Sequence, residues 1–217
     1  MQSVHSEQII AAFRDVATAS VSDALQAMNL PGHLSTGIRQ IVPGKLVGPA
    51  VTVREVPTTE TEPPTHALRL IDESPAGSVV CIDAGGTLDV AVWGGLMTAG
   101  AVANQLAGAV LDGAVRDVEE ILRDYDLPIY ARGTSPGTTL GSYRTVSANE
   151  PVVCGGVTVH AGDLIVADTD GVVCVPAAHV ADVLAAAVDI ENREREQAKL
   201  ILASGSLAEG LARYNRI

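Results

Sequence analysis

An arginine followed directly by an aspartate, Arg116-Asp117, is the pair in this sequence best suited to chemistry. It lies in the stretch VLDGAVRDVEEIL, where an apolar run ends at Asp112-Gly113 and a helical pattern begins. A guanidinium group can clamp a carboxylate or an enolate, and a carboxylate can bind a divalent cation. Because an arginine beside the amino end of a helix is unfavourable unless an anion shares the site, Arg116 indicates a bound anion.

Asp117 also has a purely structural interpretation. In the capping-box pattern D-V-E-E, Asp117 accepts a backbone N–H while Glu120 reaches back to the start of the helix. Capping residues are common at helix starts, so the pattern leaves the two interpretations of Asp117 evenly matched. It does not account for Arg116.

A glycine-rich segment, AGGTLDVAVWGGLMTAG, follows an apolar run and opens a helix near Gly94-Gly95. The free amides of Leu96 and Met97 at that helix start can hold a small anion. The simpler interpretation is that the glycines only permit a tight turn. The segment lacks G-x-G-x-x-G and G-K-[ST] spacing, so it does not support a dinucleotide or nucleoside triphosphate site.

Histidine and cysteine spacing argues against a zinc site. The five histidines show no ligand pattern, and the cysteines are isolated within apolar runs, as expected of buried thiols in a reducing compartment. Asp168 and Asp170, in ADTDGVV, are most simply a hairpin turn. A metal would therefore be held by oxygen ligands and water, which favours Mg²⁺ or Mn²⁺. Lys45 and Lys199, the two lysines of the chain, lie in no motif typical of a Schiff base.

Composition restricts the partners. The chain has 217 residues, of which 47% are hydrophobic and 18% charged, as in globular proteins with a large core. Its formal net charge of -12 argues against a nucleic acid partner, and an anionic substrate needs a local cation. The start MQSVHSEQII is unlike a secretion signal, and no uninterrupted apolar stretch is long enough for a membrane span. We therefore expect a cytoplasmic protein without a membrane partner.

The elements that would position these residues alternate along the chain. Two helices are expected first, at 7–17 and 18–28, with Ser20 or Ser22 as N-cap of the second. Strands at 40–48 and 50–56, with a turn at Pro43-Gly44, and a helix ending near residue 73 follow. From residue 78, strands and helices alternate as β-α-β-α-β, which is typical of a parallel sheet. The last segments are β hairpins within 139–176 and a long helix at 179–204, charged in its second half.

At this point the sequence resembles a known family. The segments AVWGGLMTAGAVANQLAGAVLDGAVRDVEEI, PIYARGTSP and GGVTVHAGDLIVADTDGVVCVP are similar to those of 4-hydroxy-4-methyl-2-oxoglutarate aldolases and of RraA, the regulator of ribonuclease E activity. The resemblance covers nearly the whole chain. It implies one α/β domain over residues 1–217, with a layered β/β/α, swivelling-domain-like fold, a central parallel β-α-β-α-β unit and additional β hairpins.

The family has two branches. The aldolases are metal-dependent, class II pyruvate aldolases that also decarboxylate oxaloacetate. The ribonuclease regulators bind and inhibit an enzyme without catalysis, and typically lack the acidic residue after the arginine. Because this chain retains that residue as Asp117, the resemblance favours the lyase, with the regulator as the alternative.

Residue roles follow from the resemblance. Arg116 would bind the pyruvate moiety and neutralise the developing enolate, and Asp117 would bind Mg²⁺, Mn²⁺ or another divalent cation directly. The helix start at Gly94 would hold the pyruvate carboxylate through the amides of Leu96 and Met97.

Two further acidic residues, Asp23 and Glu194, match positions that the family uses from an adjacent subunit to hold metal-bound water. The resemblance therefore implies a homotrimer or homohexamer, with the 179–204 helix at a subunit interface. Many aldolases of the family carry an acidic residue where this chain has Gly95. Its loss removes a carboxylate that would position water or act as a base, so aldol cleavage is affected more than decarboxylation.

Overall fold

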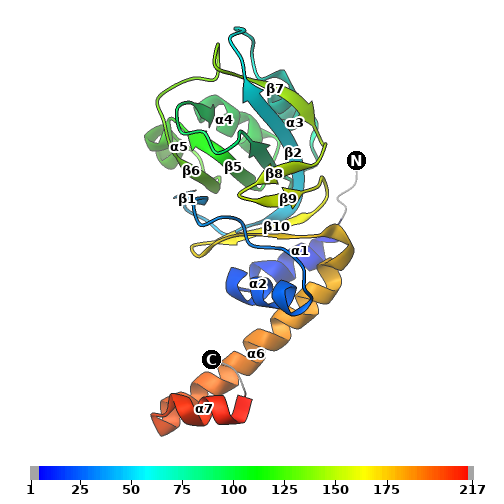
Figure 1. Ribbon diagram of the computed structural model, residues 1–217, viewed down its shortest axis with the longest axis vertical. Coiled ribbons are helices and arrows are strands. Elements are labelled where there is room, and N and C mark those ends of the chain that lie inside the picture. Colours follow the sequence, from blue (N-terminus) through cyan, green and yellow to red (C-terminus); the bar gives the residue numbers. More distant parts are fainter. Residues whose placement is uncertain (1–4, 215–217) are drawn as a thin grey trace.

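The computed structural model describes residues 5–214 (Figure 1). Strands and short helices form one body, and the long helix α6 (Val180–Ser204) projects away from it. Residues 1–4 and 215–217 of the predicted 1–217 domain lie outside the described residues.

A strongly curved mixed sheet forms the body. Within residues 5–214 it has nine strands, in the order β1-β6-β5-β3-β2-β10-β11, with β4 beside β5 and β7 beside β2. The bounds are β1 Arg39–Val42, β2 Leu46–Pro57, β3 Val79–Asp83, β4 Ala91–Trp93, β5 Gly108–Val115, β6 Ile129–Thr134, β7 Tyr143–Ala148, β10 Leu164–Asp168 and β11 Gly171–Val175. A small hairpin of β8 (Val152–Cys154) and β9 (Val157–Val159) lies against this sheet.

The predicted parallel unit is confirmed. β3, α4 (Gly95–Ala103), β5, α5 (Val118–Asp124) and β6 follow one another, and β5 pairs in parallel with β3 and β6. Every residue of β5 is buried, because a central parallel strand is covered on both faces. This explains why its sequence is a continuous apolar run interrupted only by Asp112-Gly113.

Alternate residues of the central strands enter different cores. Ile82 and Leu111 pack with residues of α3 (Thr65–Glu73), α4 and α5 on one face. Cys81 and Val110 pack on the other face, enclosed by the curved sheet. The expected burial of the thiols is confirmed, and burial raises the pKa of each; they are Cys81, Cys154 and Cys174, all of them free.

A third core joins the sheet to a helical layer. α1 (Glu7–Arg14), α2 (Thr18–Ala27) and the start of α6 pack on β10 and β11. The predicted hairpin at Asp168 is confirmed, with Asp168 opposite Gly171. The turn at Pro43-Gly44 joins β1 to β2, which are not neighbours, because β1 pairs with β6.

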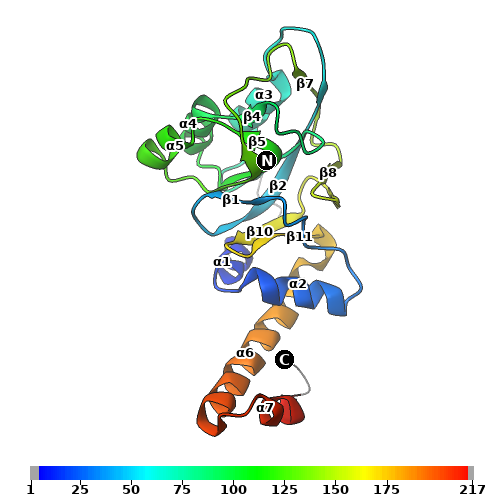
Figure 2. The same ribbon diagram turned by 60° about the vertical axis from the view of Figure 1, so that its left-hand side comes forward.

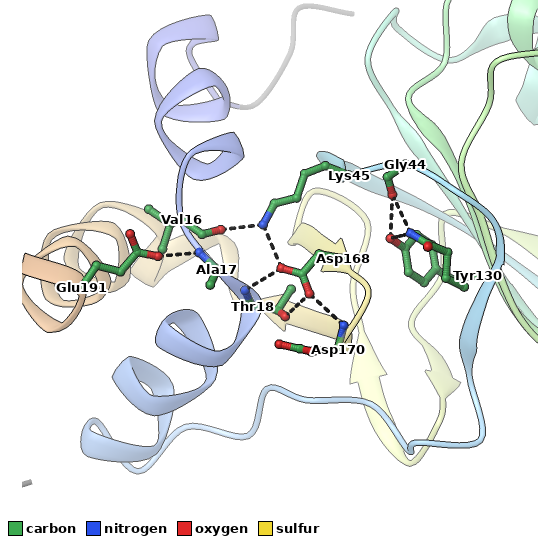
Figure 3. A network of polar contacts seen from close by, with 10 residues as sticks. Val16, Ala17, Thr18, Gly44, Lys45, Tyr130, Asp168, Asp170 and Glu191 are labelled. Atoms are coloured by element: carbon green, nitrogen blue, oxygen red, sulfur yellow. Dashed lines mark hydrogen bonds and ion pairs between the residues drawn. The ribbon is translucent and has the colours of Figure 1, made fainter. Parts of the chain in front are cut away.

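Asp168 connects the hairpin to the helical layer (Figure 3). Its carboxylate accepts hydrogen bonds from the Thr18 amide, at 3.0 Å, and from the Thr18 hydroxyl, at 2.5 Å. Lys45 Nζ pairs with the same carboxylate at 3.1 Å and donates to the Val16 carbonyl. Asp168 is therefore more than a turn residue, because it holds the amino end of α2.

The expected N-cap of α2 at Ser20 or Ser22 is wrong. The helix begins at Thr18, with Ala17 as N-cap. Its amino end is held by distant carboxylates, since the Ala17 amide donates to Glu191 at 2.6 Å and the Thr18 amide donates to Asp168. Because these carboxylates accept hydrogen bonds from the first amides of the helix, α2 does not need a serine cap of its own.

The long helix ends in an arm that the sequence pattern did not separate. Gly205 stops α6 in the left-handed conformation, with φ 70°, and α7 (Leu207–Tyr214) folds back beside it (Figure 2). Leu202, Leu207 and Leu211 expose 85%, 59% and 45% of their surfaces on this arm. Among the helices of residues 5–214, none is both long and apolar enough to cross a membrane.

Candidate active site

Arg116 and Asp117 connect the end of β5 to the start of α5. The Arg116 amide donates to the Trp93 carbonyl at 3.0 Å, which fixes the turn against the neighbouring β4. The carboxyl ends of parallel strands are where α/β folds place their ligands. The pair therefore lies at the edge of the sheet where the sequence predicted it.

Asp117 has a left-handed backbone conformation, with φ 60° and ψ 29°. This conformation is uncommon for a residue with a β-carbon, although aspartate tolerates it better than most residues. Its side chain does not cap α5. Instead, Asp117 Oδ2 accepts a hydrogen bond from the Gly95 amide at 3.0 Å, at the amino end of α4. The capping-box interpretation is wrong, because the carboxylate serves a different helix.

The side chains of the two candidate residues converge. Arg116 Nε lies 3.4 Å from Asp117 Oδ2, and the side chains are 41% and 38% exposed. A hollow of about 350 Å³, large enough for a three-carbon keto acid, opens beside them. Its walls come from Val115, Arg116, Asp117, Val118, Glu119, Thr134, Ser135 and Pro136.

Gly94 and Gly95 leave space for acidic side chains. A β-carbon on Gly94 would lie 2.7 Å from Asp117 Oδ2 and 3.0 Å from Arg116 Cγ. A β-carbon on Gly95 would lie 2.6 Å from Glu120 Oε1. The close approach of Arg116 and Asp117 to α4 therefore depends on Gly94, whereas Gly95 leaves room for the Glu120 carboxylate.

The amino end of α4 presents the amides that the sequence pointed to. The first α-helical bond runs from the Thr98 amide to the Gly94 carbonyl at 3.0 Å, so the amides of Leu96 and Met97 precede the helical ladder. No hydrogen bond among the described residues uses either amide. The Leu96 side chain is 89% exposed, which leaves this helix end open.

Two residues that the sequence analysis did not single out support this helix end. Trp93 is buried and donates from Nε1 to the Thr98 hydroxyl at 2.8 Å, and that hydroxyl donates to the Gly94 carbonyl at 3.0 Å. In the sequence, the single tryptophan directly before two glycines was the feature that could have drawn attention to this helix end.

A second arginine near the carboxyl ends of the strands is committed elsewhere. Arg132, at the end of β6, forms an ion pair with Asp112, which is only 4% exposed. Asp112 also accepts from the Gly155 amide at 2.8 Å. Arg116 is therefore the better placed of the two to meet a ligand.

Asp23 and Glu194 do not join this site within one chain. Asp23 lies on α2 and Glu194 on α6, two helices that pack against each other on the far side of β10 and β11 from α4 and α5 (Figure 1). They can reach Arg116 and Asp117 only from another copy of the chain.

Residues 5–214 contain no cluster of three or more histidine, cysteine, aspartate or glutamate side chains suited to a metal. Mg²⁺ can nevertheless bind where a single aspartate is available, since this ion retains several waters and needs only one or two protein carboxylates. Asp117 has one carboxylate oxygen, Oδ2, turned to Gly95 and Arg116, so Oδ1 is the atom that remains for a cation.

A larger hollow, of about 620 Å³, lies on another part of the body and contains none of these residues. It is mostly apolar and is lined from α3, β2 and the segment after β7, including His66, Arg69 and Asn149. We do not assign the chemistry to it, because the paired guanidinium and carboxylate lie elsewhere.

The family model described as RraA-like, Aldolase/RraA, matches residues 18–174. The chain belongs to the RraA-like family. Among its relatives, a provisionally named 4-hydroxy-4-methyl-2-oxoglutarate aldolase of Halalkalibacterium halodurans is 35% identical over 193 residues, which cover 86% of this chain and 87% of the relative. Protein DlpA of Legionella pneumophila is 38% identical over 88% of this chain, which spans 31% of that longer protein.

Solved structures of RraA-like proteins have the same fold. An uncharacterized protein of Pseudomonas syringae superposes with a TM-score of 0.83, at 32% identity, over 94% of this chain and 97% of that one. Streptomyces coelicolor RraAS2, described as an unusual member of the RNase ES inhibitor RraA family, gives 0.84 at 27% identity, over 90% and 99%. The predicted α/β fold class is thereby confirmed.

Proposed function

We propose that this RraA-like protein is a divalent-metal-dependent lyase that releases pyruvate from 4-hydroxy-2-oxo acids and decarboxylates oxaloacetate. The observation that carries the proposal is the convergence of Arg116 and Asp117, which both line an open hollow, while the Asp117 carboxylate binds the Gly95 amide at the amino end of α4. The aldolase names of relatives at about 35% identity support the same class of reaction.

The residues of the chain have distinct tasks in this reaction. The amides of Leu96 and Met97 hold the substrate carboxylate, since they are donors outside the helical ladder at the positive end of α4. Arg116 places fixed positive charge where the oxyanion of the pyruvate enolate develops. Removing one such donor from an oxyanion site typically lowers kcat by about 10² to 10³.

Asp117 would hold the divalent cation, with water in most of the remaining positions. Such a cation polarises the 2-oxo group as a Lewis acid when it is bound. The Gly95 amide and Arg116 fix the orientation of the Asp117 carboxylate, and Asp117 lines the hollow. Lysine chemistry is not required, and Lys45 and Lys199 are both engaged in ion pairs with carboxylates.

We further propose that the site is completed by a neighbouring copy in a homotrimer or homohexamer. Asp23 and Glu194 of an adjacent chain would then hold metal-bound water. The projecting α6–α7 arm, with its exposed leucines, is a surface suited to such contact.

The test is pyruvate release from oxaloacetate in the presence of Mg²⁺. We expect activity that EDTA abolishes and that Arg116→Ala lowers at least a hundredfold. Arg144→Ala is the matched control, because Arg144 is an exposed arginine that pairs with Glu60 and Glu62 away from the hollow. Metal-independent activity, or full activity of Arg116→Ala, would refute the proposal.

The alternative is a non-catalytic regulator that binds a ribonuclease. The likeness to RraAS2 and to the RNA-processing inhibitor RraA of Thermus thermophilis favours it. The retained Asp117 and the open hollow favour the lyase. A nucleic acid partner remains unexpected for a chain of net charge -12. Absence of pyruvate release across oxaloacetate and 4-hydroxy-2-oxo acids, combined with inhibition of a ribonuclease, would support the regulator.

A further inference from the structure

The carboxylate of Glu120 occupies the space that a side chain at position 95 would fill. A β-carbon built on Gly95 would lie 2.6 Å from Glu120 Oε1, 3.0 Å from Cδ and 3.3 Å from Oε2. The carboxylate group itself therefore faces Gly95, rather than the aliphatic part of the side chain.

Asp117 approaches the same glycine from its amide side. Asp117 Oδ2 accepts from the Gly95 N–H, while Glu120 lies over the Gly95 Cα. The carboxylates of Asp117 and Glu120 thus flank Gly95 at the amino end of α4. Glu120 lies one helical turn after Asp117, which brings both residues to the same side of α5.

No hydrogen bond among the described residues accounts for this placement. Glu120 makes no capping bond back to the Asp117 amide, and the charge interaction it has is with Arg123, one turn further along the same helix. Glu120 is half-buried between α5 and α4, although an ionised side chain is better hydrated in open solvent.

We propose that Glu120 is the base of the carbon–carbon cleavage step, acting directly or through one water on the 4-hydroxyl group of the substrate. This inference rests on the proposed lyase function.

The step balances as follows. Glu120 takes the proton of the 4-hydroxyl, the C4–O bond becomes a carbonyl, and the C3–C4 bond breaks. The electron pair of that bond remains on the three-carbon fragment as the pyruvate enolate, facing Arg116. The proton is then returned to C3, which gives pyruvate, and the second product leaves as a carbonyl compound.

Decarboxylation of oxaloacetate makes a different demand. Its C3–C4 bond breaks with loss of CO₂, and the electron pair again stays on the enolate. No hydroxyl proton has to be removed, so this reaction needs Arg116 and the cation but no base. A base at Glu120 is therefore expected to affect one of the two reactions selectively.

The test compares both reactions in Glu120→Gln. We expect cleavage of 4-hydroxy-4-methyl-2-oxoglutarate to fall by about 10² or more, the usual range for a general base, while oxaloacetate decarboxylation stays within about twofold. Asp124→Asn is the matched control, because it removes one carboxylate from the exposed end of the same helix. Both of its activities are expected to match wild type.

Glu120→Asp gives a second measurement, because it keeps a carboxylate at the position. This variant is expected to retain more aldol cleavage than Glu120→Gln, with decarboxylation again within about twofold of wild type. Equal loss of both reactions in Glu120→Gln, or unchanged aldol cleavage in that variant, would overturn the role of Glu120. A wild-type enzyme that decarboxylates but never cleaves the hydroxy acid would overturn it too. A wild-type protein without decarboxylation would instead refute the lyase proposal on which this role rests.

Discussion

Gly94 and Asp117 approach so closely that a β-carbon on the glycine would lie 2.7 Å from Asp117 Oδ2. The Gly94 backbone is extended, with φ -162°, so its conformation does not require glycine. Space is the reason for the residue, because the same β-carbon would also lie 3.0 Å from Arg116 Cγ. The pairing of Arg116 with Asp117 thus depends on the absence of a single methyl group.

Gly94→Ala is expected to separate the pair and to lower pyruvate release at least tenfold, while the thermal unfolding midpoint changes little because both side chains are partly exposed. The measurement is steady-state turnover of oxaloacetate beside a melting curve. Gly100→Ala, within the helix that Gly94 precedes, is the control, since its β-carbon meets only the Ile71 methyl at 3.3 Å. Full activity of Gly94→Ala would show that this approach is unimportant.

Asp117→Asn separates the charge of the residue from its shape. An asparagine carbonyl can still accept from the Gly95 amide, so the free energy of unfolding should stay within about 1 kcal/mol of wild type. Loss of the anionic ligand should weaken Mn²⁺ binding at least tenfold by titration calorimetry. Asp72→Asn, an exposed carboxylate on α3, should bind as wild type does. Equal affinity in Asp117→Asn would mean that the cation binds elsewhere.

The Asp168 network predicts acid sensitivity. Partial burial by itself raises the pKa of this carboxyl, but the hydrogen bonds from Thr18, Asp170 and Lys45 together lower the pKa below its ordinary value. A lowered folded-state pKa stabilises the fold above the unfolded-state pKa of about 3.9, and this stability is lost as pH falls through the folded-state pKa.

Asp168→Asn is therefore expected to lower the free energy of unfolding by about 2 kcal/mol at pH 7, with a smaller difference at pH 3. Chemical denaturation at the two pH values measures this. Asp170→Asn is the control, because only the backbone amide of Asp170 binds in the network (Figure 3). An equal loss for both variants would indicate a general charge effect.

Glu55 predicts a stability change of opposite sign. It is 4% exposed, both carboxylate oxygens lack a hydrogen-bond partner, and burial raises its pKa to about 7. Between its ordinary pKa of 4.5 and pH 7 the unfolded chain is ionised while the folded chain keeps the proton. The free energy of unfolding should therefore fall as pH rises through this range, by about 3 kcal/mol in total.

Glu55→Gln should remove this pH dependence. The free energy of unfolding of the variant should therefore rise relative to that of wild type between pH 5 and pH 8, as measured by denaturant titration. Glu209→Gln, in the exposed arm, is the control and should keep the wild-type slope. Parallel pH profiles for wild type and Glu55→Gln would contradict the assignment.

The sequence pattern was sufficient to predict those elements whose structure depends on residues close together in the chain. The alternation of strands and helices from residue 78 predicted the parallel unit, because buried runs and amphipathic segments carry their own periodicity. It also placed Arg116 at the carboxyl end of β5. The turn at Asp168 and the helix start at Gly95 were predicted for the same reason.

The sequence pattern could not predict which groups individual side chains bind. The capping box assigned the Asp117 carboxylate to its own helix, and the serine caps assigned α2 to local groups. In the fold, the Asp117 carboxylate instead accepts a hydrogen bond from Gly95, 22 residues away, and the Asp168 carboxylate accepts one from Thr18, 150 residues away. A hydrogen bond is chosen by which groups packing brings together, which short-range propensity does not specify.

The sequence by itself determined that an arginine and an aspartate end a buried parallel strand beside a glycine-rich helix start, because periodicity and residue type are local properties. Only the tertiary structure decided that the Asp117 carboxylate turns toward α4, that Glu120 covers Gly95 and that Arg132 is occupied by Asp112. Those outcomes follow from the packing of α5 against α4 and of β5 against β6, which fixes distances between residues that are far apart in the chain.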